Sequence, residues 1–247
     1  MYKSVCCAKV DGDLCDLRTP LGKDCKVELL TFDNVDGQKT FWHTASHVLA
    51  QAVKRLYPNA KCAIGPAVDN GFYYDFDVEK PFSPEDLEKI KAEMKKIVKS
   101  GLELERVELS PEEAEKKLEE MNEPYKVELV KEHSDKGEHI TFYKQGEFID
   151  LCAGPHLMSV APIKAIELTA CTGAYWRGDA NNAQLCRVYG VAFPKASMLE
   201  EHLKKLEEAK LRDHNKLGRE LEYFTTVDYV GQGLPILLPK GARVVQL

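Results

Sequence analysis

The chain has 247 residues, 44% of them hydrophobic and 30% charged, and a formal net charge of -6. This length and apolar content can bury a sizeable core, which excludes a disordered tail. The acidic balance argues against a protein that coats nucleic acid through bulk charge, and no DNA partner is expected.

No apolar leader and no stretch near the ~20 apolar residues of a membrane span is present, and the eight cysteines form no C-x-x-C pair. We therefore expect a cytoplasmic protein with reduced thiols and no membrane partner.

The first forty residues predict a small β-rich piece. Strand-like segments at 4–10, 14–17 and 25–32 are separated by turn signals such as Asp11-Gly12. Two or three isolated strands are marginal in water, so this piece is a poor candidate for an independent fold.

A helix is predicted from Phe41, where the apolar period becomes helical, to the stop signal Tyr57-Pro58. Its apolar stripe consists of Ala45, Leu49, Ala52 and Leu56. At about 100° per residue, His43 and His47 lie roughly 180° from this stripe. We expect both histidines to face away from the helix's own core side.

Further along the chain, strands and helices alternate. The aromatic run 72–76 is typical of a half-buried strand, and two helices follow the N-cap residues Ser83 and Ser110. Strands are then predicted at 140–143, 148–151, 163–169 and 184–193. A single amphipathic helix over 196–224 and a new strand and turn pattern over 231–241 follow. These elements predict an α+β fold, with an antiparallel or mixed sheet packed against long helices.

Two separated motifs offer chemistry: His43-Thr-Ala-Ser-His47 on the predicted helix and Cys152-Ala-Gly-Pro-His156 on a turn at the end of a strand. Each is weak alone, since short motifs often mark solvated faces and a cysteine is often an inert buried thiol. Together, three imidazoles, a thiol and the nearby Asp150 suit either a zinc site or direct activation of water. Both interpretations point to hydrolysis or to a structural metal.

Five blocks in order make the whole chain resemble the N-terminal part of a bacterial threonyl-tRNA synthetase. They are 42–52, 71–75, 150–156, 175–179 and 213–220. The two histidine motifs alone would also fit the editing domains of alanyl-tRNA synthetases and free-standing alanyl-tRNA editing proteins.

The resemblance implies removal of serine wrongly attached to threonine tRNA. A missing methyl group is worth only about 1–3 kcal/mol of discrimination, so a second, hydrolytic sieve is required. His43 and Cys152 would position or activate water, and His47 and His156 would complete the pocket. Lys126 would contact the terminal adenosine or assist the reaction. The remaining two site residues, Tyr74 and Asp150, would hold the seryl group.

The resemblance also implies a division of the chain. A partial TGS-like β module would span 1–39, the editing domain 40–195, a linker helix 196–224 and the start of a truncated class II aminoacylation domain 225–247. Since the aminoacylation core and the anticodon-binding domain would lie beyond the chain, no ATP site and no aminoacylation are expected. The fragment is expected to be a monomer, whereas full-length members dimerise.

The sequence leaves alternatives open for both the cofactor and the activity. His43, His47, Cys152 and His156 would be the ligands if zinc were bound, but the resemblance implies editing without a metal. The partner would be the acceptor 3′ end of tRNA carrying a seryl ester. A non-catalytic tRNA-binding or regulatory remnant and a zinc-dependent alanyl-tRNA deacylase are the competing hypotheses.

Overall fold

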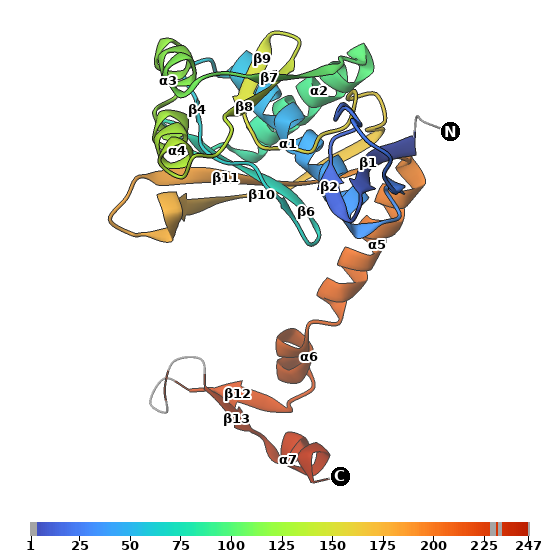
Figure 1. Ribbon diagram of the computed structural model, residues 1–247. Helices are drawn as coiled ribbons and strands as arrows, with labels where there is room; N and C mark the ends of the chain where they lie inside the picture. The colour runs from blue at the N-terminus through green and yellow to red at the C-terminus, as the bar shows by residue number, and fades with distance from the viewer. Residues whose placement is uncertain (1–3, 228–230, 232–233, 247) are drawn as a thin grey trace. The chain divides into compact units, whose positions relative to one another are not determined.

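The computed structural model describes residues 4–227, 231 and 234–246, and the chain divides after Leu199 into two compact units. Each unit is described by itself. The sequence-based boundaries at 39/40, 195/196 and 224/225 stay predictions. Figure 1 shows the course of the chain.

A small antiparallel sheet comes first, with strand order β2-β1-β3. Its strands are β1 (Val5–Val10), β2 (Asp13–Cys15) and β3 (Val27–Thr31). They correspond to the three predicted segments, because short alternating runs bounded by turns are a local signal. The segment between β2 and β3 crosses to the rest of the unit, where Arg18 hydrogen-bonds the carbonyl of Leu104.

Two further antiparallel sheets make up the larger part of this unit. The main sheet has the order β10-β11-β6-β4, with β5 also paired to β6. Its strands are β4 (Lys61–Cys62), β5 (Ala67–Val68), β6 (Gly71–Asp77), β10 (Ala165–Tyr175) and β11 (Gln184–Phe193). The other sheet, order β7-β8-β9, consists of β7 (Leu104–Glu108), β8 (Thr141–Gln145) and β9 (Phe148–Leu151). The predicted α+β class with antiparallel sheets and long helices is confirmed.

Helix α1 (Val35–Leu56) is the central element of the unit. It starts six residues before the predicted Phe41, because its first turn lacks apolar periodicity and packs instead through Gly37, which lies close against the Thr31 carbonyl of β3. It ends at Leu56, as predicted. One side contacts β6 and β11 of the main sheet. The other side meets the β7-β8-β9 sheet, where the Gln51 amide donates to the Gln145 carbonyl at 3.1 Å.

The expectation that the histidines face away from the core needs correction. The face opposite the predicted stripe is also covered, so His47 is only 2% exposed, whereas the stripe residue Leu56 is 39% exposed. A second sheet packs on the histidine side, which periodicity within one helix cannot reveal. The helix is therefore buried on nearly all sides over most of its length.

Helices α2 (Pro84–Ser100) and α3 (Pro111–Glu120) begin at the predicted caps. Ser83 and Ser110 each accept a hydrogen bond from the backbone N–H three residues later, and both capping boxes are complete. Helix α4 (Pro124–Asp135) was not predicted. It buries only Lys126 and Val130 among its residues, so it lacks the apolar stripe that announces a helix.

The elements from Ala196 onward are short, and the first of them begins in the first unit and ends in the second. The predicted single helix 196–224 is instead two helices, α5 (Ala196–Leu211) and α6 (His214–Glu220). Asp213 breaks the run, since its carboxylate caps α6 by accepting from the backbone N–H groups of Asn215 and Lys216. The other elements are β12 (Phe224–Thr226), β13 (Pro235–Leu237) and α7 (Pro239–Val245). Part of the predicted 231–241 pattern, residues 232–233, lies outside the described residues.

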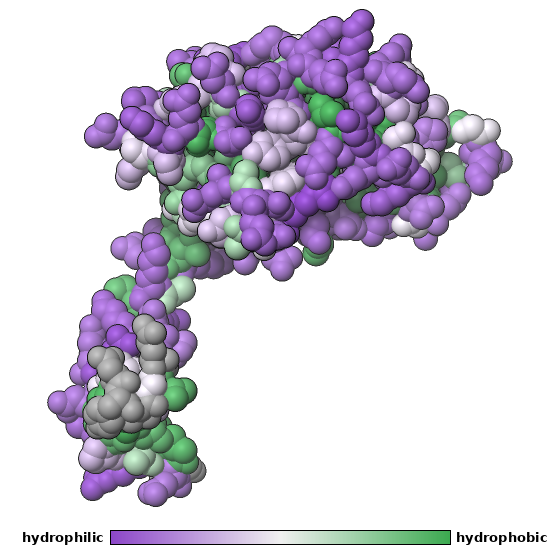
Figure 2. Space-filling model, turned by 90° about the vertical axis from the view of Figure 1, so that its left-hand side faces the viewer, coloured by the Kyte–Doolittle hydropathy of each residue, from purple (hydrophilic) through white to green (hydrophobic). Residues whose placement is uncertain are grey.

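The surface is mostly polar. Figure 2 shows a face of the molecule largely covered by hydrophilic residues. The α2 side chains Lys95, Lys96 and Lys99 are exposed, as expected for a solvated helix face, whereas Lys91 is only partly exposed and its Nζ lies 2.8 Å from the Glu167 carboxylate of β10. All eight cysteines are free thiols. Among the described residues, no helix is long and apolar enough to cross a membrane.

Candidate active site

The two separated histidine motifs meet in space. His43 and His47 project from α1, and Cys152 and His156 come from the loop that follows β9. Cys152 Sγ lies 3.3 Å from His43 Nε2 and 3.2 Å from His156 Nε2. The His47 and His156 ring centroids are 4.2 Å apart. The predicted cluster of three imidazoles and one thiol is therefore a real constellation in the fold.

The three imidazoles are neutral at physiological pH. Burial lowers the pKa of His43 to about 4 and that of His47 to about 3. Burial also holds the pKa of His156 well below its usual value. Each ring therefore keeps one bare nitrogen, which can accept a proton or bind a metal.

The thiol of Cys152 is protonated at neutral pH in the absence of a metal. Burial raises its pKa to about 12, against the opposing effect of the hydrogen bond from the Gly154 backbone N–H. Gly154 has φ +76°, outside the right-handed helical region, and a Cβ there would lie 2.3 Å from the Tyr143 hydroxyl oxygen. This sharp turn aims the sulfur at the imidazoles.

Asp150 on β9 forms a buried ion pair with Lys126 on α4. Asp150 Oδ1 lies 2.8 Å from Lys126 Nζ, and both side chains are 4% exposed. The Tyr74 hydroxyl donates to Asp150 Oδ2 at 2.6 Å, and His47 Nε2 lies 3.7 Å from the same oxygen. Burial opposes both charges, but the Lys126 ammonium lowers the pKa of Asp150, and the Asp150 carboxylate raises the pKa of Lys126.

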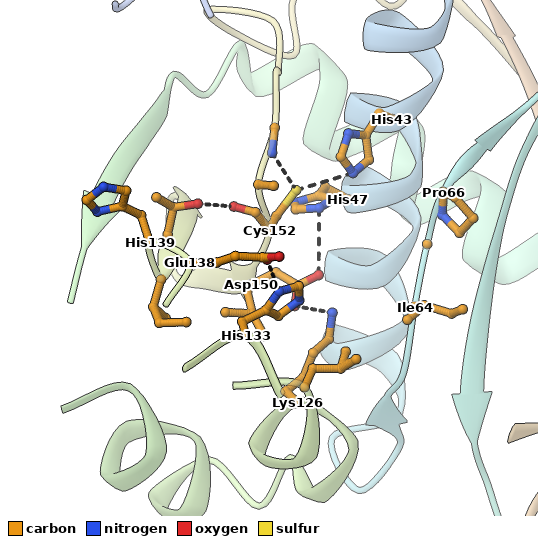
Figure 3. Close-up of a pocket in the computed structure, with 17 residues that line it drawn as sticks. His43, His47, Ile64, Pro66, Lys126, His133, Glu138, His139, Asp150 and Cys152 are labelled. Carbon is orange, nitrogen blue, oxygen red and sulfur yellow. Dashed lines mark hydrogen bonds and ion pairs between the residues drawn. The ribbon is translucent and has the colours of Figure 1, made fainter. Parts of the chain in front are cut away.

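A cavity of about 370 Å³ opens beside these groups. His43, His47, Lys126, Asp150 and Cys152 line it (Figure 3). In the described structure its lining does not include Tyr74 or His156, which are fully buried behind it. Five of the seven sequence-predicted residues thus face one cavity, and the other two contact Asp150 or Cys152.

Several lining residues were not predicted. They include Ile64, Gly65, Pro66, His133, Glu138 and His139. The ring of His133, in the last turn of α4, hydrogen-bonds Glu138 at 2.5 Å, and Glu138 lies in the segment that joins α4 to β8. No motif marks these positions, because the cavity forms only when that segment lies across from α1.

The cluster fits a zinc ion. One ligand atom from each of His43, His47, Cys152 and His156 lies within 4.8 Å of the others. His47 Nδ1 is buried and has no hydrogen-bond partner in the described structure. Four nitrogen and sulfur donors form the ligand set that zinc prefers. The residues present are therefore compatible with a metal at this position.

Comparisons with known proteins agree with the motifs. Residues 140–189 match the family model described as threonyl and alanyl tRNA synthetase second additional domain. A threonine–tRNA ligase of Clostridium perfringens is 58% identical over 246 residues, covering 100% of this chain and 38% of the relative. Those of Clostridium tetani and Acetivibrio thermocellus are also 58% identical, over 244 and 233 residues, or 99% and 94% of this chain.

The chain spans about 38% of the length of the two Clostridium relatives. The matched stretch includes the first histidine motif, the cysteine turn and the elements that join them. The resemblance to bacterial threonyl-tRNA synthetases is therefore confirmed over the whole chain, with residues 140–189 matching the second additional domain that the threonyl enzymes share with the alanyl enzymes.

Proposed function

We propose that this site hydrolyses the ester of seryl-tRNA(Thr), the mischarged product of threonyl-tRNA synthesis. The observation that carries the proposal is the convergence of neutral imidazoles, a thiol and a buried ammonium–carboxylate pair on one cavity. Hydrolysis of an ester needs a base for water and polar groups that orient the substrate. The cavity contains both kinds of group.

In the proposed reaction, the bare nitrogen of His43 removes a proton from water while the water oxygen attacks the ester carbonyl carbon. The bond between that carbon and the ribose oxygen of the terminal adenosine then breaks, and the proton passes to the ribose oxygen. The products are serine and tRNA with a free hydroxyl. Cys152 is a protonated thiol in the metal-free site, so it positions the water and does not act as the base.

Asp150 is proposed to hold the seryl group. Its carboxylate lines the cavity and stays ionised, so it can accept hydrogen bonds from the seryl amino or hydroxyl group. Tyr74 holds one carboxylate oxygen and Lys126 the other, which fixes its direction. We propose that threonine is excluded because its extra methyl would clash with this closely packed wall.

Discrimination between esters is the direct test. We expect the chain to hydrolyse preformed seryl-tRNA(Thr) much faster than threonyl-tRNA(Thr) or alanyl-tRNA, because only serine has the hydroxyl and lacks the methyl. Cys152→Ala is expected to lower the seryl rate, and Cys25→Ala, outside the cavity, to leave it unchanged. Release of labelled amino acid measures each rate.

The outcomes of that assay separate the hypotheses. Absence of hydrolysis with all three esters, in a sample that binds tRNA, would favour a non-catalytic tRNA-binding or regulatory role. Preference for the alanyl ester would favour an alanyl-tRNA deacylase. Co-migration of the chain with uncharged tRNA would support the proposed tRNA partner, and its mass in solution would test the proposed monomer.

We propose that editing needs no metal, because the cavity already holds a neutral base and a charged pair. If zinc binds, His43, His47, Cys152 and His156 would hold it, and it would supply Lewis-acid polarisation of the ester or of water.

Metal removal tests this part. Dialysis against EDTA is expected to leave the seryl-tRNA hydrolysis rate within about twofold of a mock-dialysed sample, with metal content followed by elemental analysis. If activity is lost on dialysis and returns with stoichiometric zinc, in parallel with metal content, the proposal that editing needs no metal is contradicted. His133→Gln, which removes a cavity histidine outside the four-residue cluster, serves as the control for altered metal uptake.

A further inference from the structure

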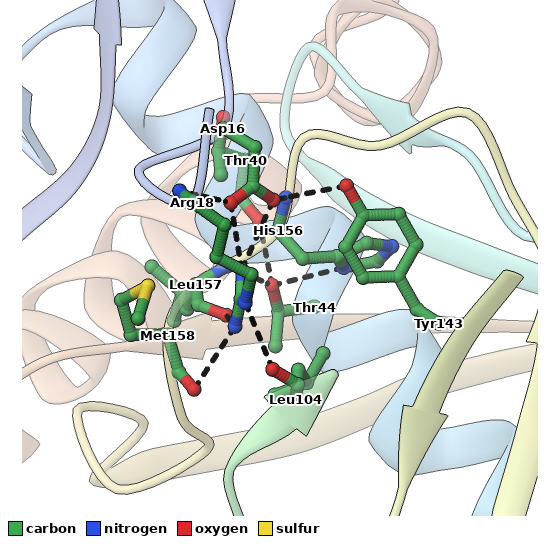
Figure 4. A network of polar contacts seen from close by, with 9 residues as sticks. All are labelled: Asp16, Arg18, Thr40, Thr44, Leu104, Tyr143, His156, Leu157 and Met158. Atoms are coloured by element: carbon green, nitrogen blue, oxygen red, sulfur yellow. Dashed lines mark hydrogen bonds and ion pairs between the residues drawn. The ribbon is translucent and has the colours of Figure 1, made fainter. Parts of the chain in front are cut away.

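The polar network behind His156 involves residues that neither histidine motif identifies as functional (Figure 4). Asp16, which follows β2, is 5% exposed. Its Oδ2 accepts from the His156 backbone N–H at 3.3 Å and from the Tyr143 hydroxyl at 2.9 Å. Arg18 donates to its Oδ1 at 2.8 Å. The main chain of His156 is thus fixed by a carboxylate from the N-terminal sheet segment.

The ring of His156 is held separately, by Thr44. This threonine lies on α1 between His43 and His47 and is fully buried. Its hydroxyl oxygen is 3.0 Å from the Thr40 carbonyl oxygen, 3.0 Å from the Leu157 backbone nitrogen and 3.2 Å from His156 Nδ1. Three partners therefore surround one hydroxyl.

The hydrogen-bonding capacity of a hydroxyl decides how these three contacts are made. A threonine has one O–H donor and two acceptor lone pairs. The Thr40 carbonyl can only accept, so it takes the hydroxyl proton, and the Leu157 N–H can only donate. The second lone pair of the Thr44 oxygen can then form a hydrogen bond with His156 only if Nδ1 carries a proton. All three contacts are satisfied only when His156 is the Nδ1–H tautomer.

That tautomer leaves His156 Nε2 bare, and Nε2 is the atom 3.2 Å from Cys152 Sγ. A protonated thiol can donate its S–H to this nitrogen, which leaves the sulfur lone pairs free to accept the Gly154 backbone N–H at 3.2 Å. In the opposite tautomer, the Nε2–H of His156 would point at the thiol. The bare Nδ1 could then not donate to the buried Thr44 oxygen, and that contact would lose its hydrogen bond.

We propose that Thr44 is a positioning residue for the reaction of this site: its hydroxyl fixes the tautomer and the ring orientation of His156, and through His156 the direction of the Cys152 thiol. The proposal rests on the proposed esterase function for its activity arm. Its spectroscopic arm is independent of that function. The two can therefore fail separately.

The spectroscopic arm uses the full chain labelled with ¹⁵N-histidine, treated with EDTA and recorded near pH 7. His156→Asn assigns the His156 signals. We expect His156 Nδ1 to give a protonated, pyrrole-type shift and Nε2 a bare, pyridine-type shift. In Thr44→Val, which keeps the branched shape but removes the hydroxyl, the pattern should shift toward protonated Nε2. Thr44→Ser should restore the wild-type pattern.

A matched control lies one turn earlier on the same helix. Thr40 is also buried, and its hydroxyl donates to the Asp36 carbonyl of α1 at 2.9 Å. Thr40→Val removes only this side-chain hydroxyl and keeps the Thr40 backbone carbonyl that accepts from Thr44, so both its spectrum and its activity should match the wild type.

In the activity arm, Thr44→Val is expected to lower kcat for seryl-tRNA hydrolysis by about 10–100-fold, the usual effect of losing such a supporting contact, with KM little changed. Thr44→Ser should recover the rate. The inference is overturned if wild-type His156 carries its proton on Nε2, if Thr44→Val leaves the nitrogen shifts unchanged, or if Thr44→Ser fails to rescue both readouts. If the wild type hydrolyses no ester while the tautomer shifts as expected, only the proposed function fails.

Discussion

Replacing Lys126 by methionine is expected to lower the free energy of unfolding by about 3–5 kcal/mol. The substitution keeps an unbranched side chain one atom shorter than lysine but leaves the Asp150 carboxylate buried without its cation. Tyr74 supplies one hydrogen bond to that carboxylate and does not replace a charge. The effect is large because both side chains are only 4% exposed, so water cannot compensate.

Denaturant unfolding at pH 7, followed by tryptophan fluorescence, measures this loss. The two tryptophans of the chain, Trp42 and Trp176, both belong to the unit that ends at Leu199, so the signal reports that unit. Lys126→Met combined with Asp150→Asn should recover most of the loss, since no unpaired charge remains.

A surface ion pair provides the matched control. Lys96 Nζ also lies 2.8 Å from a carboxylate, that of Glu93 on α2, but the Lys96 side chain is 73% exposed. Lys96→Met should cost less than about 1 kcal/mol. A similarly small loss for Lys126→Met would contradict the buried-pair interpretation.

His43→Gln is expected to lower kcat for seryl-tRNA hydrolysis by about 10²–10⁴-fold, the range of a lost general base. Glutamine keeps a polar group at the position but cannot take a proton at neutral pH. Single-turnover deacylation, corrected for spontaneous hydrolysis, measures the change. His214→Gln in the second unit is the control and should retain the wild-type rate.

The pH profile of the wild type gives an independent readout. The base must be neutral, and the pKa of His43 is lowered to about 4 by burial, so protonation removes the base only as the pH falls through that value. The rate should therefore be nearly constant from about pH 8 to about pH 5 and fall below it. A profile that falls with an ordinary histidine pKa near 6.5 would argue against His43 in this role.

Local signals in the sequence predicted the elements well, and long-range contacts account for what was missed. Ser83 and Ser110 were identified as caps because capping is settled within four residues. Helix α4 was missed because its buried face contains Lys126, a residue type that usually indicates a solvated surface. Only the family resemblance pointed to that lysine.

The candidate site was predicted only in part, because some of its residues are recognised only through long-range contacts. The ligand-type residues carry recognisable side chains, so their motifs stand out. Thr44 and Asp16 do not: their contacts to His156 span 112 and 140 residues. The roles of these two residues depend on atoms of another strand or loop. In the sequence, a threonine between two histidines looks like an ordinary residue of the helix surface, because the His156 turn that packs on it is far away along the chain.

The burial of α1 between two sheets has a consequence for local opening. The helix that presents His43 and His47 also contributes Val48, Leu49 and Val53 to the main hydrophobic cluster. Any fluctuation that detached this helix would expose that cluster, so it costs nearly the full free energy of unfolding the unit. We expect the backbone amides of residues 45–53 to be among the last to exchange with deuterium. The imidazole of His47 is therefore expected to be carried by one of the slowest-exchanging segments of the unit, and that of His43 to lie one turn before it.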